Sequence, residues 1–130
     1  MNSQEIIKCY AANERDFQHL NLSQVYLKGV DFSGADFSYA NLTSANLSEA
    51  DLSCAKLIWT DLNRADLQKA NLHFANLLNV SLLWANLNEA DLSKANLTGA
   101  RLNYAKLHSV CLREANHDSC TLRFRMVFPQ

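Results

Sequence analysis

The stretch ANLNEADLSKANLTGA, residues 85–100, repeats one five-residue pattern three times. Each copy has alanine, then aspartate or asparagine, then leucine, then two variable residues. Stepping by five from Phe17 gives 22 central positions as far as Leu122 without an insertion or deletion, and 21 of them are Leu or Phe. The exception is His117. We call the central residue position 0 and its neighbours −2, −1, +1 and +2, so that a period of five organises most of the chain.

The positions beside the centre are restricted as well. Position −2 is Ala in 14 of the 22 repeats, with Arg15 and Thr60 as the polar departures, and position −1 is Asp or Asn in 15. On an α-helix, steps of five residues would place successive leucines about 140° apart, so they would share no face. Positions −2 and 0 instead point to one side and −1 to the other, as in a strand. The chain must then turn at +1 and +2, which predicts a coil wound around its own apolar axis.

The motif suits such a coil. Leu and Phe fill the axis, and the small Ala lets the walls approach without overpacking. Asp and Asn at position −1 favour turns, because their short side chains bond nearby backbone amides.

The segments ADFSYANLTSANLSEADLSCA (35–55) and ANLNEADLSKANLTGARL (85–102) resemble the pentapeptide-repeat proteins, whose motif is A(D/N)Lxx. The resemblance covers Asp16 to about Leu122. It implies an all-β solenoid, a right-handed quadrilateral β-helix with four repeats per coil and so about five and a half coils. The opening YAANERDF, residues 10–17, is similar to the YAAGERDF of many small cyanobacterial members, with Asn13 in place of glycine.

Both ends of such a rod need caps. Residues 1–14 are predicted to form an N-terminal capping helix over about 3–13, with Asn2 or Ser3 as its N-cap. Its apolar residues at helical spacing are Ile6, Ile7, Tyr10 and Ala11. The β-helix is predicted over 15–124 and a C-terminal cap or tail over 125–130. Alternating apolar residues near that end are Leu122, Phe124, Met126 and Phe128. They indicate a closing edge segment, or alternatively an end-to-end dimer contact; we otherwise expect a monomer.

Charge and composition exclude several classes. The chain has 12 basic and 13 acidic residues, so no strong field selects nucleic acid or a membrane. Residues 1–66 carry 9 acidic and 5 basic groups and residues 67–130 carry 4 and 7, which gives −4 and +3. No segment approaches the roughly 20 apolar residues of a membrane helix, and the start does not read as a signal peptide. The four cysteines form no Cys-x-x-Cys motif, so we expect a protein of a reducing, cyanobacterium-like cytoplasm.

Catalysis, cofactors and metals find little support in the sequence. With four repeats per coil, residues 20 apart lie above one another, and the histidines fall in different columns. The nearest constellation is Cys54 diagonal to His73, with Ser53 and Ser93 nearby. Zinc needs three or four ligands, and only two are close. We therefore predict no catalytic, cofactor-binding or metal-binding residues.

The variable positions give a candidate partner-binding patch on two consecutive sides of the rod. It comprises Tyr39, Ile58, Trp59, Arg64, Leu78, Leu83, Trp84 and Tyr104. A contiguous apolar patch with two tryptophans is typical of an interaction site. The other interpretation is that these aromatic residues stack and stiffen adjacent coils. A separate column, Glu49–Lys69–Glu89, is interpreted as solvated surface.

The leading functional hypothesis is a non-catalytic scaffold or adaptor that binds an unknown protein partner. The first alternative follows from the resemblance, because quinolone-resistance proteins of the family mimic DNA and bind DNA gyrase. The corresponding acidic column would be Asp31, Asp51, Asn71 and Asp91, which Asn71 and then Cys111 interrupt. An unrecognised enzyme around Cys54 is the second alternative.

Overall fold

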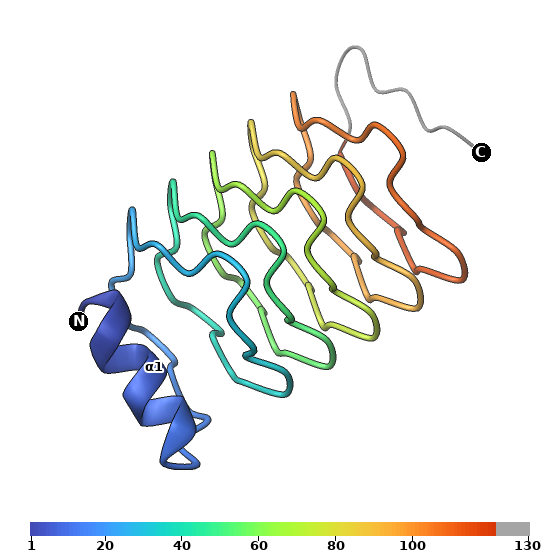
Figure 1. The fold of residues 1–130 in the computed structure, drawn as a ribbon. Coiled ribbons are helices and arrows are strands. Elements are labelled where there is room, and N and C mark those ends of the chain that lie inside the picture. Colours follow the sequence, from blue (N-terminus) through green and yellow to red (C-terminus); the bar gives the residue numbers. More distant parts are fainter. Residues whose placement is uncertain (122–130) are drawn as a thin grey trace.

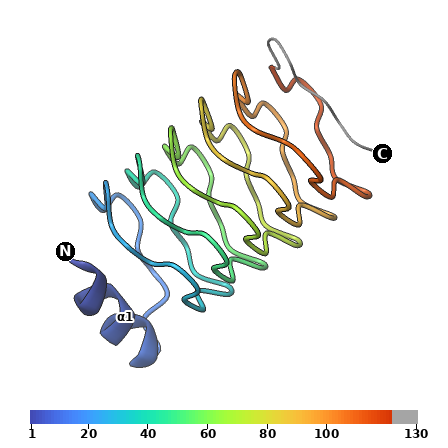
Figure 2. The same cartoon turned by 45° about the horizontal axis from the view of Figure 1, so that its top comes forward.

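We describe residues 1–121 of a computed structural model of the chain. One helix, α1 (Ser3–Ala11), lies across one end of a rod of stacked coils (Figures 1 and 2). Three predictions fall outside the described residues: the last repeat centre at Leu122, the closing segment or end-to-end contact, and the cap at 125–130. Within residues 1–121, no helix is both long and apolar enough to cross a membrane.

The coil repeats every 20 residues. Parallel bridges join residues 20 apart, such as Asp16 with Asp36 and Asn41 with Asp61. The Leu42 N–H donates upward to the Asp61 carbonyl (2.8 Å), and the Asp61 N–H donates downward to the Ala40 carbonyl (3.1 Å). This confirms four repeats per coil. Each bridge is a single residue, and the described chain contains no longer strand, because a chain that turns every five residues cannot extend one.

Positions +1 and +2 form the turns at the corners. The carbonyl at position 0 accepts a hydrogen bond from the N–H three residues later, as from Ala45 to Leu42 (3.0 Å). The residue at +2 has positive φ, for example +63° at Tyr39, which is the sign pattern of a type II turn. Positive φ is unfavourable for β-branched residues. Val, Ile and Thr accordingly never occur at +2, although Thr43 and Ile58 occupy +1.

This turn geometry predicts a stability difference between neighbouring substitutions. Lys69, at +2, is exposed with φ +60°, and its backbone N–H donates to the Asn88 carbonyl (2.9 Å), whereas its side chain makes no hydrogen bond or ion pair within residues 1–121. We expect Lys69→Val to lower the free energy of unfolding by about 1–2 kcal/mol, because a β-branched residue is strained there. Gln68→Val, one residue earlier at +1, should change it by less than about 0.5 kcal/mol. Urea unfolding measures both; equal losses would contradict the turn assignment.

The axis of the rod is apolar. Leu or Phe at position 0 and Ala at −2 are buried through most of its length. The polar exception Thr60 is 1% exposed, and its hydroxyl donates to the Phe37 carbonyl (2.9 Å). His117, which occupies a position-0 site in the last described coil, is exposed.

The side chains at position −1 support the turns as predicted. The Asp51 Oδ1 accepts hydrogen bonds from the Ser53 N–H (2.9 Å) and the Ser53 hydroxyl (2.7 Å). The same bond to the backbone two residues later recurs along the rod, for instance from Ser93 to Asp91 (2.9 Å). The repeated Asp and Asn therefore act as structural residues.

Helix α1 begins at a capping box. The Asn2 Oδ1 accepts from the Glu5 N–H, and the Glu5 Oε1 accepts from the Asn2 N–H, both at 2.9 Å. Asn2 is thus the N-cap. The helix ends at Ala11, two residues before the predicted end. Asn13 follows with φ +73°, a left-handed conformation that Asn tolerates, in the place where similar sequences have Gly.

The buried face of α1 differs in part from the predicted one. Ile6 is fully buried, and the Tyr10 ring packs edge-on against Phe32 with 5.4 Å between centroids. The Tyr10 hydroxyl donates to the Ser33 carbonyl (2.7 Å). Ile7 and Ala11 are exposed, because residues four apart share a stripe and the stripe that faces the rod is that of Ile6 and Tyr10.

Candidate functional site

The predicted patch falls on two neighbouring corners. The Trp59 corner is the stack of turns formed by residues 18–19, 38–39, 58–59, 78–79, 98–99 and 118–119. The Tyr39 N–H donates to the Ile58 carbonyl and the Trp59 N–H to the Leu78 carbonyl, both at 2.9 Å, so these four residues are adjacent.

The Trp84 corner is the next stack of turns, formed by residues 23–24, 43–44, 63–64, 83–84 and 103–104. It holds the other predicted residues, and the Arg64 N–H donates to the Leu83 carbonyl (2.8 Å). One side of the rod separates the two corners. The position −1 residues of that side are polar: Asn21, Asn41, Asp61, Ser81, Arg101 and Thr121.

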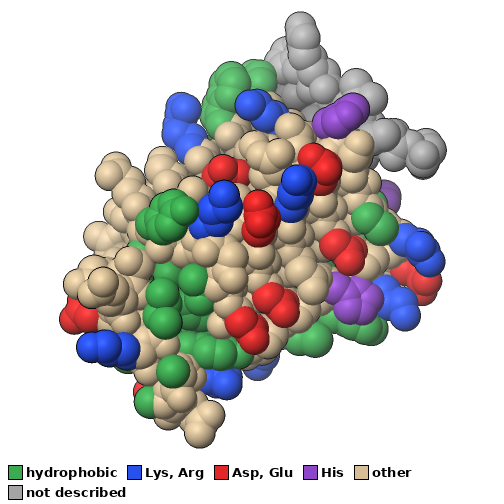
Figure 3. Space-filling view, in the orientation of Figure 1, with side chains coloured by type: hydrophobic (Ala, Val, Ile, Leu, Met, Phe, Trp, Pro, Cys, Tyr) green, Lys and Arg blue, Asp and Glu red, His purple; other side chains and the backbone are tan. Residues whose placement is uncertain are grey.

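The aromatic residues of both corners reach solvent. Trp59 is 58% exposed and Trp84 is 54% exposed, and Tyr39 and Tyr104 are exposed too. Ile58, Leu78 and Leu83 are half-buried beside them. Acidic and basic side chains are interspersed on the face shown in Figure 3, where hydrophobic side chains form separate patches.

At the Trp84 corner, side chains of the two adjacent coils contact the tryptophan ring, which is nevertheless 54% exposed. Tyr104 stacks on Trp84 with 4.4 Å between centroids and 9° between planes. The Arg64 guanidinium lies 5.8 Å from the Trp84 centroid, within the range of a cation–π contact. The contacts of Trp84 with Tyr104 and Arg64 link three adjacent coils, so the Trp84 corner fits the interpretation that stacked side chains stiffen the rod.

At the Trp59 corner, Trp59 makes no ring contact within residues 1–121. Tyr39, one coil away, stacks instead on His19, with 5.1 Å between centroids and 7° between planes. On the other side of Trp59 the column continues with small residues, Asn79 and Gly99. The Asn79 side chain fills the space that a Cβ on residue 99 would take. Trp59 is therefore the aromatic of the patch whose ring remains available for a partner.

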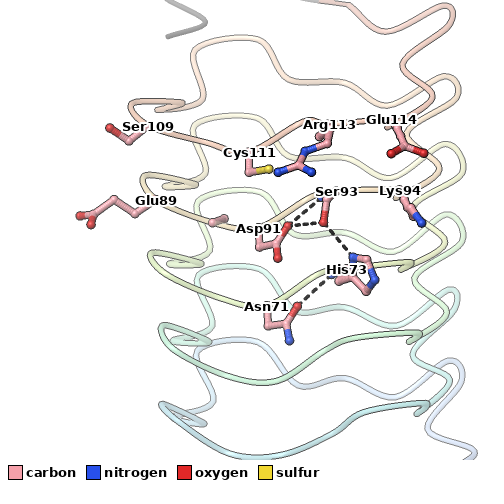
Figure 4. Close-up of a pocket in the computed structure, with 11 residues that line it drawn as sticks. Asn71, His73, Glu89, Asp91, Ser93, Lys94, Ser109, Cys111, Arg113 and Glu114 are labelled. Carbon is pink, nitrogen blue, oxygen red and sulfur yellow. Dashed lines mark hydrogen bonds between the residues drawn. The ribbon is translucent and has the colours of Figure 1, made fainter. Parts of the chain in front are cut away.

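A groove of 670 Å³ lies on another side of the rod (Figure 4). Its lining includes Asn71, His73, Asp91, Ser93, Cys111 and Arg113. The His73 Nδ1 is 2.8 Å from the Ser93 Oγ, whose hydroxyl donates to the Asp91 Oδ1 (2.6 Å). Because the Ser93 hydroxyl donates its single proton to Asp91, Ser93 can only accept in its hydrogen bond with His73. The His73 Nδ1 is therefore the donor. A catalytic triad instead places His between Ser and Asp, where it takes the serine proton.

Cys54 and His73, the nearest constellation found in the sequence, are joined through the backbone. Cys54 is exposed, and its backbone N–H donates to the His73 carbonyl (2.9 Å), but no hydrogen bond joins the two side chains. Burial raises the pKa of the Cys120 thiol, so it stays protonated at neutral pH. Among residues 1–121, no three His, Cys, Asp or Glu side chains gather in a way that could hold a metal ion.

Two exposed aromatic residues lie outside the predicted patch, although their positions in the repeat could have revealed them. Tyr26, 62% exposed, occupies position −1, where Asp or Asn is usual. Phe74, 53% exposed, lies at +2, and the Lys94 Nζ is 5.3 Å from its ring centroid. His73 packs edge-on against Phe74 at 4.6 Å. The Phe74 ring thus has partners in its own rod, unlike Trp59.

The family described as pentapeptide repeats matches residues 16–53, 50–82 and 81–116, with 8 copies. The chain belongs to the pentapeptide repeat family. The family's right-handed quadrilateral β-helix is therefore the fold of this chain, with one short N-terminal helix. A search of curated protein sequences finds no significant match.

Solved structures of three pentapeptide repeat proteins are similar. One from the cyanobacterium Cyanothece 51142 is 28% identical with a TM-score of 0.70, over 93% of this chain and 100% of that one. One from Nostoc PCC 7120 is 32% identical with a TM-score of 0.60, over 94% and 96%. One from the Arabidopsis thaliana thylakoid lumen is 31% identical with a TM-score of 0.73, over 75% and 68%. The predicted likeness to cyanobacterial members is confirmed.

Proposed function

We propose that this pentapeptide repeat protein is a non-catalytic interaction scaffold that binds a protein partner at the Trp59 corner. The observation that carries the proposal is the 58% exposed Trp59 ring, which has no ring partner within residues 1–121. Ile58 and Leu78 beside it complete an apolar contact of the kind that anchors interfaces. The groove supports a non-catalytic role, because the Ser93 hydroxyl donates to Asp91 and not to His73, whereas a catalytic triad needs a histidine that takes the serine proton.

The partner test compares the two tryptophans. We expect Trp59→Ala to weaken capture of the partner by about 2 kcal/mol or more, the usual scale for an interface anchor. Trp84→Ala should weaken it less, because Tyr104 and Arg64 already cover that ring. Immobilised wild-type and variant chains, incubated with lysate of the native cell, allow bound proteins to be quantified by mass spectrometry. If Trp59→Ala retains every partner, the binding surface lies elsewhere.

The gyrase-inhibitor alternative has less support. A DNA mimic needs a continuous acidic surface, but Lys94 and Arg113 line the groove together with Asp91 and Glu89. A gyrase supercoiling assay separates this alternative from the scaffold, and we expect no inhibition. We further propose that the protein acts in the cytoplasm without direct contact to nucleic acid or membrane; fractionation of the native cell tests the compartment.

A further inference from the structure

We propose that the Trp59 corner pairs with the same corner of a second copy of the chain, in antiparallel orientation. This inference rests on the proposed function and names the partner. A two-fold axis at the interface, perpendicular to the rod, reverses the order of the coils while it keeps each column opposite itself. The first coil of one copy then faces the sixth of the other, the second faces the fifth, and the third faces the fourth.

In the +2 column of this corner, large and small side chains are so ordered that an antiparallel copy of the column places small residues opposite large ones. From the first coil to the sixth it contains His19, Tyr39, Trp59, Asn79, Gly99 and Ser119. Three rings are followed by three small residues, so antiparallel pairing places every ring opposite a small side chain. Trp59 meets Asn79, and Tyr39 meets Gly99. A parallel pair would instead place each ring against its own copy.

The +1 column is symmetric in polarity. In coil order it contains Gln18, Ser38, Ile58, Leu78, Thr98 and Asp118. The two apolar residues are central, so Ile58 of one copy meets Leu78 of the other. Polar residues pair with polar residues on both sides of this contact. Burial of the apolar centre within a polar rim is the usual anatomy of an interface.

Charges beside the corner do not oppose the pairing. On one flanking side, Asp16 and Asp36 would face Asn116 and Asn96 of the second copy. On the other side, Arg101 would face Asn41. The pairing therefore places no two like charges directly opposite each other at these positions. Contacts between like charges would disfavour association.

The other corners lack this combination. The column Glu49–Lys69–Glu89 would place Glu49 opposite Glu89 and Lys69 opposite itself. At the Trp84 corner, stacked rings lie toward one end, and reversal of its five described turns would place Leu83 opposite Thr43 and Arg64 opposite itself. The Phe74 column offers one exposed ring, which His73 and Lys94 already contact.

The contact is a narrow strip along roughly 24 Å of rod, five steps of about 4.8 Å. Such an area is below that of stable complexes, so association should be weak and visible only at high protein concentration. Sedimentation velocity of the full chain, at protein concentrations from about 20 µM to about 1 mM, can detect such weak association. We expect the weight-average sedimentation coefficient to rise from a monomer value toward a dimer value.

A swap of residues 59 and 79 tests the size matching. Asn79→Trp adds apolar surface but places two rings opposite each other, and it should weaken association at least about tenfold. Trp59→Asn leaves a gap and should weaken it too. The double variant Trp59→Asn, Asn79→Trp restores ring against small residue and should recover the association. All three should keep the wild-type circular dichroism spectrum, since both residues already occupy +2 turns with φ +55° and +56°.

The orientation is tested by photo-cross-linking. A benzophenone side chain in place of Tyr39 should link to the peptide around Gly99 of the second copy, and not to its own segment. A wild-type chain that stays monomeric, stronger association of Asn79→Trp, failure of the double variant to recover, or a link between the two copies of residue 39 would each overturn the proposal. The scaffold function is judged separately, since Trp59-dependent capture of a different protein would survive a monomeric result.

Discussion

Phe32→Ala is expected to lower the free energy of unfolding by about 3–5 kcal/mol. Phe32 is fully buried and lies at the centre of an aromatic cluster, with ring centroids 5.4 Å from Tyr10, 6.1 Å from Phe17 and 5.4 Å from Phe37. Alanine would leave a cavity where α1 packs on the first coils. The cost therefore includes lost apolar burial and loss of the surface that supports the helix.

Chemical denaturation followed by circular dichroism measures this loss. Phe74→Ala is the matched control, because the same residue type there is 53% exposed. It should cost less than about 1 kcal/mol. Hydrogen exchange of α1 amides adds a local test: protection should fall in the Phe32 variant and remain in the Phe74 variant. Equal losses in the two variants would mean that the aromatic cluster does not hold the cap.

Leu72→Ala should cost about 2–5 kcal/mol, since the side chain is 1% exposed in the middle of the rod. Its walls are hydrogen-bonded to the coils on both sides, and so they cannot easily close around a cavity. Urea unfolding gives the value. Lys69→Ala, on an exposed side chain, should change stability by less than about 0.5 kcal/mol. A similar loss at both positions would show that the inward register is wrong.

Asn88→Ala should not be neutral, although Asn88 is a turn residue at position +1. The Asn88 Oδ1 accepts a hydrogen bond from the His108 N–H of the next coil (2.9 Å). Loss of this bond should cost about 0.5–1.5 kcal/mol. An outward position in the repeat therefore does not imply an unpartnered side chain.

Most of the rod could be predicted from the sequence, because each repeat states its own geometry. Leu at 0 and Ala at −2 define what is buried, and the missing β-branched residues at +2 report a positive φ there. The number of repeats per coil came only from family resemblance. Residues 20 apart are joined by backbone hydrogen bonds, which every residue type can make. The sequence pattern therefore does not show how many repeats form a coil.

The candidate site was less predictable. Columns of residues 20 apart correctly placed Arg64 beneath Trp84, and Tyr104 above it. The sequence did not show that this stack covers the Trp84 ring while the Trp59 ring has no such cover, since that depends on side-chain rotamers. The prediction of the buried face of α1 was also partly wrong. The helix has two adjacent apolar stripes, and packing on Phe32 determines which of them is buried.

The 20-residue spacing of the backbone bonds restricts how the length of this chain can change during evolution. A one-residue insertion would shift every later leucine out of the axis, much as a frameshift alters every later codon. An insertion of five residues between Arg64 and Trp84 would preserve the buried register yet rotate all later repeats by one side, so that these two residues would no longer meet. Only an insertion of a whole coil keeps the axis and also keeps the columns of the two parts aligned with each other. Length variants that keep a surface site should therefore differ in units of 20 residues, whereas a substitution at a corner leaves the columns in place and is restricted mainly by the positive φ at position +2.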